Sequence, residues 1–192
     1  SSVYITIRPY TPNTVVFDGI LLTGISSTTA LLRFNQGYYA ILEGVEVKNS
    51  AGRGIHVYQS HHIIVRNCLV HDIDYRGIGG SGHYVTIEGN ECYNCVMSNE
   101  NQAFSGGGWA GVISTSEFST TGEASTHWTI SNNTVHNSWG EGIITGHLNG
   151  GVITGNTVYN VFSVSIYVDY GIHQVIENNY LFFNDPQYKR DG

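Results

Sequence analysis

Charged residues are scarce in this chain: they make up 12% of its 192 residues, and the formal net charge is −7. No run of Lys and Arg is present, so the sequence predicts no nucleic-acid surface, because phosphate backbones are bound by clustered basic side chains. No apolar run approaches the ~20 residues that a membrane-spanning helix requires. We therefore expect neither a nucleic-acid partner nor a membrane span.

Proline and cysteine are also rare, with three residues each, whereas glycine is abundant with 24. The cysteines Cys68, Cys92 and Cys95 cannot form a closed set of disulfides, and no second pair or histidine stands at zinc-finger spacing. We predict buried free thiols. The abundance of Gly, together with recurrent Val, Ile, Tyr and Thr, favours short strands and tight turns over helices.

A repeat organises the chain. The phrase Asn-Thr-Val-aromatic-Asn begins at Asn133 and again at Asn156, 23 residues later. Most steps in a series of corner residues have the same length, with a first step of 25 and one step of 43: Gly19, Gly44, Asn67, Asn90, Asn133, Asn156 and Asn179. An aliphatic series three residues earlier has the same steps: Val16, Ile41, Ile64, Ile87, Ile130, Ile153 and Ile176. A second aliphatic series also repeats every 23 residues, except for steps of 34 and 31 around Val112: Leu32, Ile55, Ile78, Val112, Ile143 and Ile166.

A period in this range indicates stacked units that bury one continuous core. No segment shows a sustained helical period, so each unit should consist of short strands. We predict an all-β solenoid, a single-stranded parallel β-helix of about seven to eight coils of ~23 residues, as one domain over residues 1–192. The Asn series should stack at sharp corners, where Asn tolerates a left-handed backbone and its amides bond from coil to coil.

Four segments carry a family resemblance: "GIHVYQSHHIIVRNCLVHDIDYRGI", "HYVTIEGNECYN", "WTISNNTVHNSWGEGI" and "VSIYVDYGIHQVIENNYLFFND". They resemble right-handed parallel β-helix repeats of the pectate-lyase-like superfamily, and the resemblance covers nearly the whole chain. It implies a right-handed coil, an extracellular or cell-surface location, and a polysaccharide partner. The implied activity is that of a lyase or C5-epimerase acting on uronic-acid-containing polysaccharide. A non-catalytic adhesin or glycan-binding module and a glycoside hydrolase are the alternatives.

The regular interval breaks between Asn90 and Asn133, which lie 43 residues apart. We expect two loop insertions there, at about residues 96–109 and 116–125, on either side of a strand near Val112. Insertions in a solenoid commonly line its binding face. Phe104 and Trp109 are candidate platforms for stacking on sugar rings.

Strand alternation places a row of polar side chains on the outer face beside these loops. We expect five residues to supply the base, the acid and the carboxylate partners of a uronate lyase or epimerase: His56, Tyr58, Arg53, Arg76 and His83. Four more should contact substrate: Glu141, His147, Tyr167 and Asp169. The remaining histidines should be surface or stacked turn residues: His61, His62, His71, His127, His136 and His173.

The sequence shows departures from individual branches of the superfamily. Polygalacturonase-type hydrolases carry an Asp pair and a Gly-His-Gly, whereas this chain has only Gly82-His83 and no Asp-Asp. No metal site is expected, although Asp72 and Asp74 offer oxygens suited to Ca²⁺. The chain begins and stops within extended segments, which predicts end-to-end self-association or further β-helix coils outside it.

Overall fold

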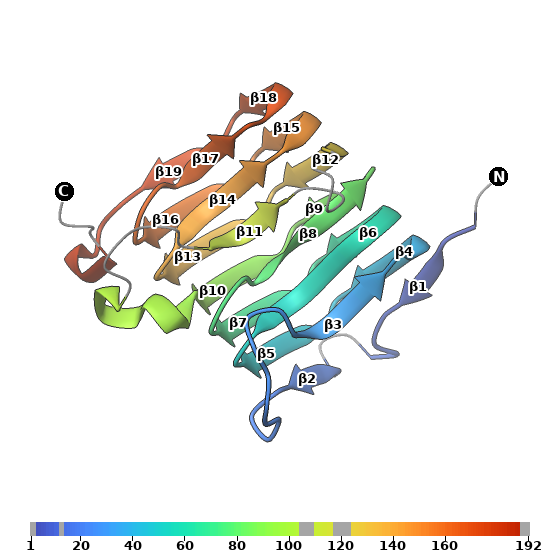
Figure 1. The fold of residues 1–192 in the computed structure, drawn as a ribbon, viewed down its shortest axis with the longest axis horizontal. Coiled ribbons are helices and arrows are strands. Elements are labelled where there is room, and N and C mark those ends of the chain that lie inside the picture. The colour runs from blue at the N-terminus through green and yellow to red at the C-terminus, as the bar shows by residue number, and fades with distance from the viewer. Residues whose placement is uncertain (1–2, 12–13, 104–109, 117–123, 189–192) are drawn as a thin grey trace.

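The structure is a computed structural model and describes residues 3–11, 14–103, 110–116 and 124–188. Within these ranges the chain folds into short strands and two short 3₁₀ segments, η1 (Met97–Gln102) and η2 (Pro186–Tyr188). All pairings between strands are parallel, and each strand lies beside the strand one turn earlier or later (Figure 1). The protein is a right-handed parallel β-helix, as the sequence predicts.

Three faces make up each turn. Face A consists of β3 (Ala30–Asn35), the first half of β6 (Arg53–Arg66), β8 (Ile78–His83), β11 (Gly111–Thr115), β14 (Glu141–Gly146) and β17 (Ile166–Asp169). Face B consists of β1 (Ile5–Ile7), β4 (Tyr38–Glu43), the second half of β6, β9 (Thr86–Glu88), β12 (Ser125–Ser131), β15 (Leu148–Thr154) and β18 (Ile172–Glu177). Face C consists of β2 (Val16–Asp18), β5 (Glu46–Ser50), β7 (Leu69–Ile73), β10 (Glu91–Cys95), β13 (Thr134–Ser138), β16 (Thr157–Val161) and β19 (Tyr180–Phe182).

These strands form about six turns. The sequence predicts seven to eight because it counts Val16 as the first member of the series that continues with Ile41. In the structure Val16 lies on face C opposite Glu46, whereas β1 pairs with β4 on face B. The strands β1 and β2 therefore belong to an incomplete first turn, ahead of six turns that each have all three faces.

Aliphatic side chains fill the interior, one above another. Ile130 lies opposite Ile87 on one side and Ile153 on the other, and Ile153 lies opposite Ile176, which confirms the stacking. Nearer the N-terminus the expected series is wrong by one residue: Leu42 and Val65 are buried at 1% and 0% exposure, and Ile41 and Ile64 are not. The cause is one shorter turn, since Val65 lies opposite Ile87, 22 residues away.

The same correction applies to face A. Ile113 lies opposite Ile78 and Ile143, so it takes the series position expected of Val112. Both side chains are fully buried. Ser114, the next residue of β11, lies opposite Ile144.

Two ladders run along the corner between faces B and C, where the sequence predicts one. The first has a left-handed backbone and alternates Gly with Asn: Gly44, Asn67, Gly89, Asn132, Gly155 and Asn178, with φ between 52° and 67°. The second lies one residue further on and is buried: Asn90, Asn133, Asn156 and the partly exposed Asn179. Its side-chain Nδ2 groups donate to the next Oδ1 at 2.9–3.0 Å.

The sequence assigns two roles to one Asn series, the left-handed corner and the amide hydrogen bonds between coils. In the structure, each ladder has one of these roles. Asn67 belongs to the left-handed ladder, whereas Cys68 occupies the amide position below Asn90 and donates its backbone N–H to Asn90 Oδ1 at 3.0 Å. Cys68, Cys92 and Cys95 are all buried and free, as expected. Residues 96–103 of the first expected insertion include η1, and residues 104–109 and 117–123 lie outside the described ranges.

Candidate functional site

Arginines from three segments converge on the outer surface of face A. Arg33 comes from β3, Arg53 from the start of β6, and Arg76 from the residues just before β8. The parallel register places Arg33 opposite His56, and it places His56 opposite Gly79. Because Gly80 has no Cβ, which would lie 2.9 Å from His56 Cδ2, the imidazole packs closely against β8 and is only 6% exposed.

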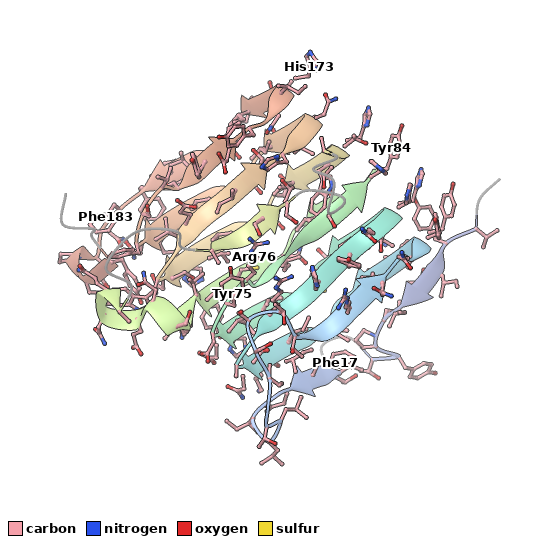
Figure 2. The ribbon with its side chains drawn as sticks, viewed as in Figure 1. Phe17, Tyr75, Arg76, Tyr84, His173 and Phe183 are labelled. Atoms are coloured by element: carbon pink, nitrogen blue, oxygen red, sulfur yellow. The ribbon has the colours of Figure 1, made fainter. Side chains whose placement is uncertain are left out.

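We call this group the arginine cluster; it consists of Arg33, Arg53, Arg76 and His56. Its side chains contact one another and the neighbouring tyrosine rings. Arg53 Nη1 lies 2.8 Å from His56 Nε2, so the guanidinium donates to the imidazole. Arg33 Cζ lies 4.4 Å from the centre of the Tyr58 ring. Figure 2 shows Tyr75 beside Arg76, and both the Arg53 and Arg76 guanidiniums lie within 6 Å of that ring, at 5.7 and 5.5 Å.

Burial and like charge dominate the electrostatics of the cluster. Burial, and then the charges of Arg53, Arg33 and Arg76, lower the pKa of His56 from 6.5 to about 3, so the imidazole is neutral at pH 7. Burial, and then the neighbouring Arg76, also lower the pKa of Arg53. The cluster therefore holds three positive charges around a neutral ring.

Among the described residues, no ion pair joins any of these arginines to a carboxylate. Arg76 Nε is buried and has no hydrogen-bond partner in that part of the chain. A buried donor without a partner costs about 1–3 kcal/mol, and guanidinium groups bind carboxylates through paired N–H groups. The cluster thus has the positive charge to bind an anion.

The structure brings together four of the five residues that the sequence proposes for catalysis: Arg53, His56, Tyr58 and Arg76. Two neighbours were missed, Arg33 and Tyr75. Arg33 lies 23 residues before His56, so the repeat interval itself was a signal for it. The fifth residue, His83, follows the corner toward face B, where its Nδ1 lies 2.8 Å from Thr126 Oγ1.

The expected substrate-contacting residues lie further along the solenoid, on β14, β17 and the corners that follow them. The charge of Asp169, and to a lesser extent that of Glu141, raises the pKa of Tyr167. The ring of His147 stacks on that of Tyr170 at 5.1 Å. Phe104 and Trp109 lie outside the described residues.

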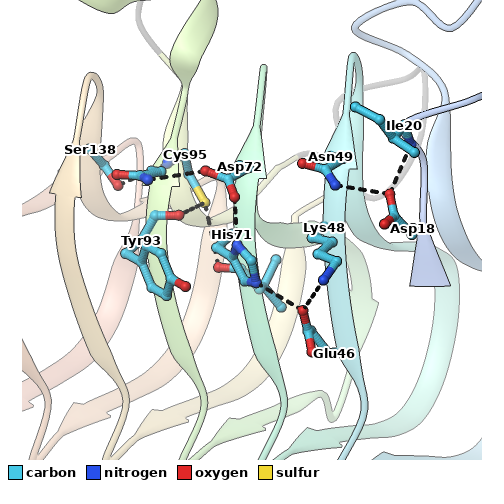
Figure 3. A network of polar contacts seen from close by, with 12 residues as sticks. Asp18, Ile20, Glu46, Lys48, Asn49, His71, Asp72, Tyr93, Cys95 and Ser138 are labelled. Atoms are coloured by element: carbon cyan, nitrogen blue, oxygen red, sulfur yellow. Dashed lines mark hydrogen bonds and ion pairs between the residues drawn. The ribbon is translucent and has the colours of Figure 1, made fainter. Parts of the chain in front are cut away.

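Face C carries a different polar surface (Figure 3). His71 Nδ1 lies 2.7 Å from Asp72 Oδ2, and His71 Nε2 lies 3.2 Å from Glu46 Oε1, which also pairs with Lys48 at 2.7 Å. Lys48 and His71 here each face a carboxylate. Face C is therefore internally paired, whereas the arginine cluster on face A is not.

The fold and the cationic surface define a solenoid protein of the parallel β-helix class. Residues 13–192 match the family model described as "Periplasmic copper-binding protein (NosD)", and the chain belongs to this NosD family. No match is found among curated protein sequences.

Two solved structures are similar to this chain at 13% sequence identity. One is an alginate lyase from Paenibacillus sp. str. FPU-7, with a TM-score of 0.53 over 98% of this chain and 84% of that one. The other is the Dettilon tailspike protein, with a TM-score of 0.44 over 94% of this chain and 55% of that one. At this identity the likeness to the lyase shows the fold alone.

The family description names copper, which proteins hold with thiolate, thioether and imidazole ligands. In the described ranges, no three His, Cys, Asp or Glu side chains come together as metal ligands. Burial raises the pKa of Cys92 and Cys95 well above its usual value, which disfavours the thiolate form that binds metals. These residues do not fit a copper centre.

Proposed function

We propose that the protein binds a uronic-acid-containing polysaccharide along face A, with the arginine cluster holding a sugar carboxylate. The observation that carries this proposal is the set of three arginines with no carboxylate partner in the described chain, one of them with a buried Nε lacking any partner there. A uronate carboxylate supplies the missing acceptor. The charge is local, because the chain as a whole carries a net charge of −7.

A polymer suits this surface better than a small anion does. Face A continues along the whole stack, so one chain of sugars can lie across successive turns (Figure 1). Tyr58 and Tyr75 border the cluster, and Tyr167 is exposed further along the same face. Aromatic rings with a polar end bind sugars by stacking and hydrogen bonding.

The geometry also favours turnover of the lyase or C5-epimerase type. In β-elimination a base removes the C5 proton, the C5–H electrons form the C4–C5 double bond, and the C4–O bond breaks as its oxygen takes up a proton. Guanidinium groups on the carboxylate stabilise the negative charge that develops in this step. In epimerisation the proton returns to C5 from the opposite side instead.

His56 and Tyr58 are the acid–base candidates. Arg53 makes the availability of the His56 lone pair depend on whether a sugar carboxylate is bound. Arg53 Nη1 donates to the lone pair of His56 Nε2 at 2.8 Å, so the imidazole is not available as a base in this arrangement. When Arg53 turns to a sugar carboxylate, the lone pair is released. The bound negative charge also raises the pKa of His56 from about 3 toward its ordinary value.

The glycoside hydrolase alternative needs a pair of carboxylates, and Glu141 and Asp169, the two acidic residues expected to contact substrate, do not form such a pair. Asp169 lies opposite Gly146, which is five residues along the strand from Glu141. That separation is about 16 Å at the rise of a β-strand, whereas hydrolase carboxylates are about 5–9.5 Å apart. Non-catalytic glycan binding is the remaining alternative, and a product assay distinguishes it from turnover.

We place the protein outside the cytoplasm, because its family is described as periplasmic. A periplasmic family supports a location outside the cytoplasm, which is the broader part of the extracellular or cell-surface expectation. In the described ranges, no helix is long and apolar enough to cross a membrane. A Ca²⁺ ion and end-to-end association of copies are further proposals. Among the described residues, β17, β18 and β19 each pair with a strand on one side alone, which leaves strand edges for such association.

The test is titration calorimetry of polygalacturonate, alginate and a neutral glucan into the protein and two arginine variants. Arg76→Gln should weaken binding of the acidic polymers about tenfold or more, because a charge-assisted hydrogen bond contributes about 1.5–3 kcal/mol. Arg66→Gln is the matched control, since Arg66 pairs with Glu43 on face B at 2.9 Å. Equal binding of the neutral glucan, or equal losses in both variants, would exclude the site.

Turnover is measured on the same polymers by the ultraviolet absorbance of unsaturated uronates and by NMR of epimerised residues. A lyase or epimerase should lose turnover in Tyr58→Phe while retaining most of its affinity. If the unaltered protein binds the acidic polymers but forms no product, it is a glycan-binding module, and the lyase or epimerase hypothesis is refuted.

A further inference from the structure

A row of rings runs along the outer corner between faces A and B, one ring from each turn. The residues of this corner ladder have a left-handed backbone with φ between 52° and 55°: Tyr39, His62, Tyr84 and His127. Their rings stack at centroid distances of 4.5, 4.9 and 4.7 Å, with interplanar angles of 24° or less. Phenol and imidazole alternate along the ladder.

The ladder is interrupted at Gly150. The register places His127 opposite Gly150, and it places Gly150 opposite His173. Gly150 and His173 have the same left-handed backbone, with φ of 71° and 53°. The next ring in the series is therefore that of His173, two turns beyond His127, and Figure 2 shows His173 at the same edge as Tyr84.

The space above Gly150 is open within the described structure. A Cβ built at Gly150 would meet only His127, with Cδ2 at 3.8 Å and Nε2 at 3.9 Å, which is ordinary van der Waals contact. His173 Nδ1 lies 3.1 Å from Asn149 Oδ1, which tethers its ring beside the gap. Two turns separate the imidazoles by about 9.6 Å, which is room for one ring at the spacing found elsewhere in the ladder.

We propose that this gap between His127 and His173 is a binding slot for a phenol ring. The chain itself repeats the arrangement that such a ligand would complete. Tyr84 lies between His62 and His127 at 4.9 and 4.7 Å. On face C, Tyr93 lies between His71 and His136 at 4.7 and 5.2 Å.

The flanks of the slot fit a ring with one polar end. Asn149 and Thr126 lie on one side and offer polar atoms, and Val152, 37% exposed, lies two residues beyond Gly150 on the outer surface. His127 and His173 are themselves exposed, so the slot opens to solvent. The ligand class is a phenolic ring, whose source is either a free phenolic compound or a tyrosine side chain of a peptide.

NMR of the histidine ring protons, with p-cresol and Gly-Tyr-Gly as probes and cyclohexanol as the non-planar control, tests the slot. We expect p-cresol to shift the His127 and His173 signals with a dissociation constant on the order of 1 mM. Cyclohexanol should bind at least tenfold more weakly. If both probes shift these signals, the phenol ring alone is sufficient for binding. If the peptide alone shifts them, the slot binds a tyrosine of a polypeptide partner.

Gly150→Tyr should abolish binding by filling the slot from within, and Gly150→Ala should retain it to within about threefold. Both variants place a side chain at the same left-handed position, so their comparison cancels the backbone strain. Gly150→Tyr should also melt at a higher temperature than Gly150→Ala, because it completes the ladder. Should either variant fail to fold, His127→Ala gives the same loss of binding from the other wall. Absent shifts, equal binding of cyclohexanol, or retained binding in Gly150→Tyr or His127→Ala would overturn the proposal.

Discussion

The buried amide ladder gives the sharpest prediction for stability. In Asn133→Leu, four hydrogen bonds are lost: Nδ2 donates to Ile87 O at 2.9 Å and to Asn156 Oδ1 at 3.0 Å, and Oδ1 accepts from Asn90 N at 3.0 Å and Asn90 Nδ2 at 2.9 Å. Leucine has the same branched arrangement of side-chain heavy atoms as asparagine, but its methyl groups can satisfy none of these groups. The backbone N–H of Asn90 and the carbonyl of Ile87 lose these partners in the interior.

The magnitude follows from the cost of unsatisfied buried groups, about 1–3 kcal/mol each. Two such groups give about 4 kcal/mol, a large fraction of the 5–15 kcal/mol that stabilises a typical domain. For a chain of this size we expect the melting temperature to fall by about 10 °C. Thermal denaturation followed by circular dichroism measures it.

The matched control is the neighbouring Asn132→Gly. Asn132 has a left-handed backbone with φ of 56°, and Gly89 and Gly155 occupy the same corner in adjacent turns. Glycine should therefore be tolerated there, with a change in melting temperature of about 2 °C or less. If Asn133→Leu also stays within that range, the amide ladder does not stabilise the fold and the reasoning is refuted.

Two further predictions concern Cys68 and His56. Cys68→Asn should raise the melting temperature by about 3 °C, because its amide would reach Leu42 O and Asn90 Oδ1 and extend the ladder by one turn; a lower melting temperature would contradict this. For His56, the folded pKa of about 3 lies below the unfolded value of 6.5, so the unfolded state binds the extra proton between these pH values. The stability contributed by neutral His56 is complete above pH 6.5 and is lost as the pH falls toward 3, so His56→Gln should flatten the fall in melting temperature across this window. An unchanged pH profile would show that His56 titrates normally in the folded protein.

The sequence predicts the fold well because its period is a direct consequence of stacking. Ile130, Ile153 and Ile176 share one position in three turns, and the register confirms this. What the period cannot reveal is a single turn of 22 residues, which shifts Ile64 to the outside and Val65 to the inside. Either residue is aliphatic, so composition does not distinguish the two registers.

The site is predicted only in part, for a similar reason. Strand alternation places His56 and Tyr58 on the outside, but it does not say which residues of adjacent turns reach them. Arg33 and Tyr75 complete the cluster through long side chains that cross between turns. The corner ladder is likewise invisible as a binding feature in the sequence, because the absence of a side chain at Gly150 matters only once His127 and His173 are known to be its neighbours.

The contrast between faces A and C is the strongest reason to assign function to face A. Stacking brings residues one repeat apart to within about 5 Å, and like charges at such positions destabilise a sheet. Face C avoids this by pairing Lys48 and His71 with Glu46 and Asp72. Face A instead places Arg53 and Arg76 one repeat apart, adds Arg33, and offers them no carboxylate within the described residues.

That arrangement lowers stability in the free protein, since each arginine raises the energy of the others. Burial, and then the same positive charges, keep His56 neutral between them. An anion bound at the cluster would remove the repulsion, satisfy Arg76 Nε and stabilise the fold together. Local departures from structural consistency of this kind are expected at functional sites, and the arginine cluster is such a departure on an otherwise regular cylinder.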